Sequence, residues 1–151
     1  MTISRYHYTG CGLDYVYLLN GFEVKDTPYG TGVSIEKADD LHRAIALSII
    51  WSHARIRGQE VRFLRGRIDL SQADLGRVLG VTRDAVAKWE AVANKPIPGT
   101  ADRLLRMFIA PHELEDEKVK DICELLREID NQTHQDVTFK EGPLGWTREA
   151  A

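Results

Sequence analysis

The chain has 151 residues, of which 43% are hydrophobic, and a formal net charge of −3. This length accommodates one or two small domains, and an ordinary content of aromatic and charged residues excludes a chain that is disordered over most of its length. The longest apolar run, residues 44–52, is far shorter than the roughly 20 residues that span a bilayer. The N-terminus lacks the pattern of a secretory signal. We therefore expect a cytoplasmic protein with no membrane segment.

The first part of the chain, residues 1–37, alternates apolar and polar positions and is interrupted by glycines, which predicts a small β-region. Asn20-Gly21 tolerates positive φ and favours a two-residue hairpin turn between the segments on either side of it. Strands are expected at residues 6–8, 15–19, 22–25 and 32–35.

From Ala38 the apolar residues recur with a helical period, and Asp39 and Asp40 stand where a helix N-terminus favours anions. This predicts a connecting helix that reaches about Ser52. Four shorter helices are expected to follow it, at Gln59 to Arg67, Ser71 to Leu79, Thr82 to Val92 and Thr100 to Ile109.

A last helix is expected from about His112 to Asn131. Its apolar stripe consists of Val119, Ile122, Leu125, Leu126 and Ile129. The stripe either forms a dimer interface or packs against the helices of its own chain. Beyond it, Val137 to Lys140 has the pattern of a short strand, and residues 142–151 are expected to be loosely ordered.

The charges are distributed unevenly along the chain. Residues 55–110 contain 11 Lys and Arg against 6 Asp and Glu, a net charge of +5, whereas residues 1–54 carry −2 and residues 111–151 carry −6. A basic central block between acidic segments indicates a module that faces nucleic acid. The only cysteines, Cys11 and Cys123, are far apart and lack a CxxC partner, so we expect reduced thiols and neither a metal nor a cofactor.

The most informative stretch runs from Leu70 to Glu90. Two short helices that meet at a steep angle need a tight turn with a small residue at the corner, which Gly80 supplies. Thr82 is placed to cap the second helix. Apolar residues have the spacing that fills the angle between the helices: Leu75, Leu79, Val81, Val86 and Trp89. The stretch therefore predicts a helix-turn-helix.

This pattern resembles the XRE family of lambda repressor-like proteins. The matching residues are Leu64-Arg65, Leu70-Ser71-Gln72, Leu75, Leu79-Gly80-Val81-Thr82, Val86 and Trp89-Glu90. The resemblance implies a five-helix DNA-binding domain whose recognition helix, Thr82 to Val92, enters the major groove of double-stranded DNA. It also implies a structural ion pair between Arg65 and Glu90.

Together these features predict an α+β chain in three parts. Residues 1–54 form a β-hairpin-rich domain with a connecting helix, residues 55–110 form the helix-turn-helix domain, and residues 111–151 form a C-terminal helix and tail that contribute to dimerisation.

The register of the resemblance gives candidate DNA contacts on the recognition helix and beside it. They are Thr82, Arg83, Asp84, Ala87 and Lys88, with Gln72 against a phosphate or an adjacent base and Arg62 and Arg67 as phosphate ligands. Arg83 and Lys88 have the alternative of being solvated surface charges. The alternative for Asp84 is a first-turn anion that stabilises its helix, because a carboxylate is repelled by phosphates and accepts only from cytosine.

A narrower resemblance, to MqsA-type antitoxins and their relatives, rests on the order of β-region, connecting helix and XRE domain and on Ile97-Pro98-Gly99 followed by Arg103-Leu104-Leu105-Arg106. It implies a cognate toxin as a partner. That family reads bases with an Asn and an Arg where this chain has Asp84 and Lys88, so its operator sequence does not carry over. The family also binds structural zinc through two CxxC pairs, and this chain has only Cys11 in that region, which leaves a tetrahedral site incomplete.

Three functions compete on this sequence. The first is a dimeric repressor of its own operon, acting as the antitoxin of a type II toxin-antitoxin pair. The second is a ligand-sensing regulator whose N-terminal domain uses Tyr6, Tyr8, Tyr15 and Tyr17 as a pocket wall. The third is an enzyme built on a Cys11–His7 pair, which we do not expect because no nucleophile motif or phosphate loop accompanies it.

Overall fold

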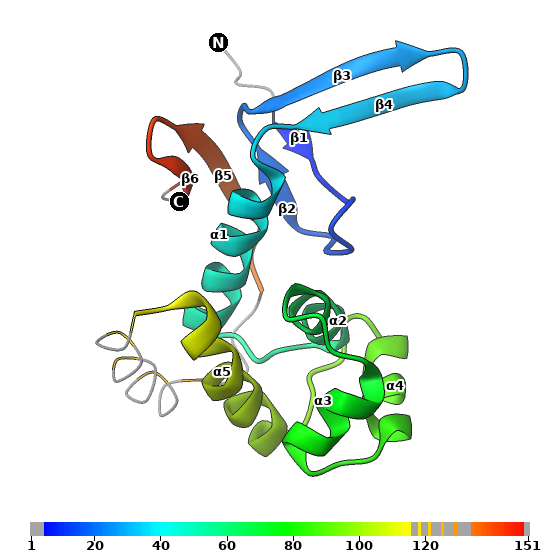
Figure 1. Cartoon of the computed structure of the whole chain (residues 1–151), viewed down its shortest axis with the longest axis vertical. Coiled ribbons are helices and arrows are strands. Elements are labelled where there is room, and N and C mark those ends of the chain that lie inside the picture. Colours follow the sequence, from blue (N-terminus) through cyan, green and yellow to red (C-terminus); the bar gives the residue numbers. More distant parts are fainter. Residues whose placement is uncertain are drawn as a thin grey trace. The chain divides into compact units, whose positions relative to one another are not determined.

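The computed structural model describes residues 5–115, 118, 121, 125, 129 and 134–149. Within these residues the chain is an α+β structure with five helices and two small sheets (Figure 1). It divides into two compact units, one of Met1–Ile45 with Gln135–Ala151 and the other of Ala46–His134. None of the described helices is both long and apolar enough to cross a membrane.

The first unit contains a four-stranded sheet in the order β1-β2-β5-β6. Its strands are β1 (Tyr6–His7), β2 (Val16–Leu18), β5 (Val137–Gly142) and β6 (Gly145–Arg148). β2 pairs antiparallel with β1 and parallel with β5, with Leu18 opposite Phe139. Because Leu18 and Phe139 are fully buried, the core of this sheet is built from segments far apart in the sequence.

The first turns of α1 (Ala38–Trp51) contact residues in or beside this sheet through polar groups. Trp146 donates its backbone N–H to Asp40 Oδ2 at 2.6 Å and its indole N–H to the Glu36 carbonyl at 2.9 Å. The Tyr8 hydroxyl lies 2.9 Å from His42 Nε2. These contacts connect the start of α1 to β6 and to the residue that follows β1, at the two ends of the sheet.

The second sheet is a hairpin of β3 (Phe22–Thr27) and β4 (Gly30–Ile35), closed at Pro28 and Tyr29. The predicted hairpin turn at Asn20-Gly21 is therefore wrong, because β2 pairs with β1 and β5 instead of β3. Gly21 does adopt a positive φ of 73°. The Asn20 side chain, however, bonds the backbone of Glu141 in both directions, at 2.7 and 3.2 Å. This dipeptide carries the chain from one sheet to the other.

The C-terminal part of the chain also departs from expectation. The strand predicted at residues 137–140 is confirmed, but the segment after it is a second strand and not a loose tail. Of the last predicted helix, His112 and Glu113 belong to α5, and Val119, Ile122 and Leu126 lie outside the described residues. Leu125 and Ile129 are each only 6% exposed, which favours packing within the chain for these two members of the stripe.

The second unit contains the four short helices at the predicted places, whereas the family resemblance implied five helices in residues 55–110. They are α2 (Gly58–Arg67), α3 (Gln72–Leu79), α4 (Arg83–Ala91) and α5 (Gly99–Glu113). The core that they enclose includes residues of the helices and of the loops between them, all at most 1% exposed: Ile56, Val61, Leu64, Leu75, Val86, Ile97, Leu105 and Ile109. The helix α5 continues through Pro111, beyond the predicted end at Ile109.

A buried ion pair on α5 connects this helix to the segment that leaves α1. Arg106 and Asp102 are both fully buried, and Arg106 Nε donates to Asp102 Oδ1 at 2.9 Å. Arg106 also donates to the carbonyls of Ile50 and Ala54, at 3.0 and 2.7 Å. Asp102 Oδ2 accepts the backbone N–H of Ile56 at 2.7 Å. Burial lowers the pKa of the Arg106 guanidinium, while Asp102 opposes that shift.

Replacing Arg106 by methionine should destabilise the chain by about 3–5 kcal/mol, because it leaves the Asp102 carboxylate buried without its cation. Chemical denaturation followed by circular dichroism measures this loss. Arg77→Ala removes an arginine whose side chain is 79% exposed and should change stability by less than about 1 kcal/mol. Equal effects of the two substitutions would contradict a structural role for the buried pair.

Candidate nucleic-acid interface

The turn between α3 and α4 is built from capping residues and two glycines. Ser71 caps α3 by accepting the Asp74 N–H at 3.0 Å, and Thr82 caps α4 by accepting the Ala85 N–H at 3.1 Å. Gly80 ends α3 in the left-handed conformation, with a φ of 74°. A Cβ on Gly76 would lie 2.8 Å from the Val81 carbonyl oxygen. The close approach of the two helices thus requires a glycine at a position that the sequence pattern did not single out.

The inner side of α4 is held by the predicted pair of Arg65 and Glu90. Arg65 donates from Nε and Nη2 to the two carboxylate oxygens of Glu90, at 2.8 and 2.9 Å, and from Nη1 to the Leu70 carbonyl at 3.0 Å. The hydrogen bonds with Glu90 raise the pKa of the Arg65 guanidinium. The expected structural role of this pair is confirmed, since it joins α2, the α2–α3 turn and α4.

The first turn of α2 packs directly on the backbone at the end of α4. A Cβ on Gly58 would lie 2.0 Å from the Trp89 carbonyl oxygen and 2.6 Å from that of Val92. Gly58 and Gln59 donate their N–H groups to the carbonyls of Lys95 and Ala93, both at 3.2 Å. The free donors at the start of α2 therefore bind the segment that follows α4.

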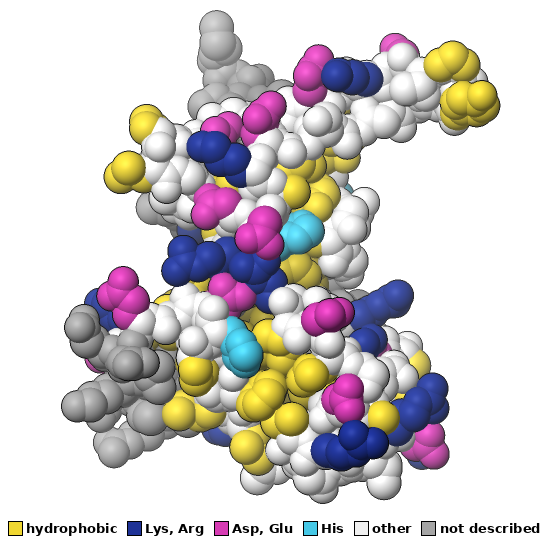
Figure 2. Space-filling view, viewed as in Figure 1, with side chains coloured by type: hydrophobic (Ala, Val, Ile, Leu, Met, Phe, Trp, Pro, Cys, Tyr) yellow, Lys and Arg dark blue, Asp and Glu magenta, His cyan; other side chains and the backbone are white. Residues whose placement is uncertain are grey.

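The outer side of α4 carries exposed charge. The side chains of Arg83 and Asp84 are 64% and 83% exposed and lie 3.6 Å apart, and Lys88 is exposed one turn further along. Figure 2 shows Lys and Arg side chains spread over the side of the second unit that holds α2 to α4, next to a few acidic ones. Because the inner side of the helix is occupied by packing, this outer side is the one that can meet a ligand.

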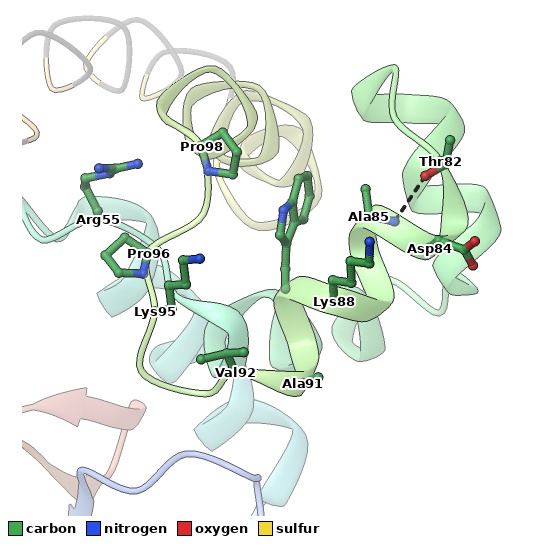
Figure 3. Close-up of a pocket in the computed structure, with 11 residues that line it drawn as sticks. Arg55, Thr82, Asp84, Ala85, Lys88, Ala91, Val92, Lys95, Pro96 and Pro98 are labelled. Carbon is green, nitrogen blue, oxygen red and sulfur yellow. Dashed lines mark hydrogen bonds between the residues drawn. The ribbon is translucent and has the colours of Figure 1, made fainter.

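A groove of about 710 Å³ lies beside α4. Its walls are α4 and the loop that leads to α5, as Figure 3 shows, and it is lined by Arg55, Thr82, Asp84, Ala85, Lys88, Trp89, Ala91, Val92, Lys95, Pro96 and Pro98. Lys88 and Lys95 approach it from the helix and the loop, respectively. Arg55 is fixed in place by donating to the Ile97 carbonyl. Three cations, Arg55, Lys88 and Lys95, and the single carboxylate of Asp84 line the groove, so its lining has a net positive charge, which favours anions.

The structure separates the predicted contact residues into groups. Thr82, Asp84 and Lys88 line the groove, Arg83 is exposed beside it, and Ala87 is half-buried on the same helix.

Three predicted contact residues lie away from the groove. Arg62 is exposed on α2 and is not among the groove residues, and the Gln72 amide lies 3.4 Å from Glu90 Oε1. The prediction of Arg67 as a phosphate ligand needs correction, because Arg67 Nε donates to Glu113 Oε1 at 2.6 Å and both side chains are nearly buried.

Sequence reasoning missed Arg55 and Lys95. Both belong to the basic block of residues 55–110, but neither lies on a predicted helix face. The loop signal Asn94-Lys95-Pro96 was the available clue to Lys95, because Pro96 and Pro98 restrict the backbone of the loop that follows α4.

Several side chains that the ligand-sensing and enzyme hypotheses would use are engaged in packing or hydrogen bonds. Tyr6 stacks on Phe22 and Tyr17 on His7. His7 Nε2 lies 2.8 Å from the Asp14 carbonyl, and burial raises the pKa of the Cys11 thiol, which disfavours a nucleophilic thiolate. Among the described residues, no group of three or more His, Cys, Asp and Glu side chains is placed to hold a metal ion.

Comparison of the chain with protein-family models, with curated proteins and with solved structures finds no significant match.

Replacing Gly58 by alanine should destabilise the chain by about 1–3 kcal/mol or more, because the new methyl group meets two backbone oxygens that cannot move aside. Gly66→Ala, in the same helix with nothing within 4 Å of the new Cβ, should stabilise it by about 0.4–1 kcal/mol. Thermal denaturation compares the pair. A Gly58→Ala variant that is as stable as the wild type would show that α2 does not hold the end of α4.

Proposed function

We propose that this chain is a sequence-specific DNA-binding regulator of the XRE type that represses its own operon as a dimer. The observation that carries the proposal is α4, a capped helix with a packed inner side and an exposed N-terminal face beside a cationic groove. The succession of α2 to α5, with the left-handed Gly80 between α3 and α4, supports assigning residues 55–110 to a lambda repressor-like domain.

Each part of the interface has a role in this proposal. The N-terminal half of α4 enters the major groove, where Arg83 and Lys88 reach base edges or phosphates. Lys95 and Arg55 bind the phosphates that border the major groove of the DNA. The antitoxin resemblance also implies a toxin partner, which would co-purify with this protein as the product of a neighbouring gene.

A gel-shift titration with a duplex from the region upstream of the protein's own gene tests DNA binding. We expect binding that prefers this duplex over a scrambled one and that weakens steeply with added salt. Lys88→Ala and Lys95→Ala should each weaken binding roughly fivefold to hundredfold, that is, by about 1–3 kcal/mol, and loss of a phosphate contact should lower the salt slope by about 0.9.

Lys140→Ala is the matched control, because it removes the same charge from an exposed position in the first unit. It should leave the affinity within about twofold. Binding that is absent, insensitive to salt or equally weakened by all three substitutions would overturn the proposal.

Asp84→Asn should strengthen DNA binding several-fold at low salt, because it removes a carboxylate from the groove and releases Arg83 from its ion pair. The same titration measures the change, with Asp74→Asn on the neighbouring helix as a control for a half-exposed acid that also pairs with an arginine. Weaker binding of the upstream duplex by Asp84→Asn, with unchanged binding of scrambled DNA, would instead identify Asp84 as a reader of cytosine.

A further inference from the structure

The hairpin of β3 and β4 presents an open strand edge. Its two strands pair only with each other in the described part of the chain, so each has an outer edge without a neighbour, and the charged pair Glu23 and Lys25 lies on β3 (Figure 1). Val24 and Val33 lie opposite each other and are 53% and 38% exposed. A two-stranded sheet is marginally stable by itself, and additional strands stabilise it.

The backbone groups at this edge can be identified from the hydrogen-bond pattern. Glu36 donates its N–H to the Gly21 carbonyl directly opposite, at 2.8 Å. Because hydrogen-bonded and non-hydrogen-bonded pairs alternate in an antiparallel ladder, Glu23 and Lys25 direct their backbone groups to β4. Phe22, Val24 and Asp26 therefore direct their N–H and carbonyl groups outward.

The side chains of β3 are arranged in a charge pattern along the same edge. Glu23 and Lys25 share one face and lie 3.8 Å apart, with side chains that are 67% and 61% exposed. Val24 points to the opposite face. Figure 2 shows acidic and basic side chains next to each other along the hairpin.

Among the three antiparallel registers that overlap most of β3 with β3 of another copy, these two patterns favour one. An antiparallel register centred on Val24 places Val24 opposite Val24 and Phe22 opposite Asp26, so that outward backbone groups meet outward backbone groups. The same register places Glu23 of each copy opposite Lys25 of the other. The two nearest registers with matching backbone groups place Glu23 opposite Glu23 or Lys25 opposite Lys25, which is unfavourable.

We propose that the protein dimerises by antiparallel pairing of β3 with β3 of a second copy, centred on Val24, to form a four-stranded sheet across a two-fold axis. The exposed valines of both copies then lie in one row on one face, and two Glu23–Lys25 pairs lie on the other. A two-fold dimer is what an XRE-type regulator requires on a two-fold operator. The link between this dimer and a two-fold operator rests on the proposed function, whereas the strand pairing rests on the residues of the hairpin.

Charge reversal on the full-length chain tests the register. Glu23→Lys places lysines opposite lysines across the axis, and Lys25→Glu places acids opposite acids, so each variant should weaken the dimer on the order of tenfold or more. An equimolar mixture of the two variants restores opposite charges at both positions and should recover the dimer. The double variant E23K/K25E, which has the wild-type composition, should recover it as well. Sedimentation velocity over a concentration series measures the dimer dissociation constant.

A wild-type chain that is monomeric at all concentrations would overturn the proposal. Single variants that dimerise as tightly as the wild type, or a mixture that fails to recover, would do the same. Binding of the single variants to a duplex with one half-site is measured in parallel, because Glu23 and Lys25 lie outside the α4 groove. Retained half-site binding with a failed dimer test would reject the strand pairing alone, whereas a recovered dimer without DNA binding would reject the proposed function alone.

Discussion

The buried pair of Arg106 and Asp102 is the contact from which the geometry of the second unit follows. Arg106 fixes carbonyls at the end of α1 and just beyond it, and Asp102 fixes the N–H of Ile56, two residues before α2 begins. The start of α2 in turn lies against the backbone that ends α4, with no room for a side chain at Gly58. A buried ion pair contributes little net stability compared with an apolar replacement of the same shape. Its value here is that the directional bonds of a guanidinium and a carboxylate specify one path for residues 50–56.

This arrangement determines which charges can act on a ligand. The basic block has a net charge of +5 by sequence, but several of its arginines are committed to carboxylates inside the protein: Arg57 to Glu60, Arg65 to Glu90, Arg67 to Glu113 and Arg106 to Asp102. The positive character of the groove therefore depends on Lys88, Lys95 and Arg55. Lysines suit such a position, because a flexible, strongly hydrated ammonium remains at the surface where a guanidinium is readily drawn into an internal pair.

The parts of the fold that were predictable from the sequence are those set by local signals. Helix periods, the capping residues Ser71 and Thr82 and the glycine at position 80 act within a few residues, and all four short helices formed where expected. The Arg65–Glu90 pair came from a family resemblance and is also confirmed. Strand partners could not be predicted in this way, because β2 pairs with β5 across more than half of the chain. Asn20-Gly21 had the local sequence of a hairpin turn, but the Asn20 side chain bonds the distant backbone of Glu141 and the dipeptide connects two different sheets. The partner of Arg67 is likewise 46 residues away.

The hairpin of the first unit illustrates how an open edge is made selective. A strand edge with free backbone groups can recruit any extended chain, and charged side chains along it are a common protection against this. Glu23 and Lys25, with one residue between them, do more than protect. A partner strand shifted by one residue meets the wrong backbone groups, and a second β3 in either neighbouring allowed register brings like charges together. Alternating charge thus disfavours the neighbouring registers and favours one self-complementary register, so specificity arises from the arrangements that are disfavoured.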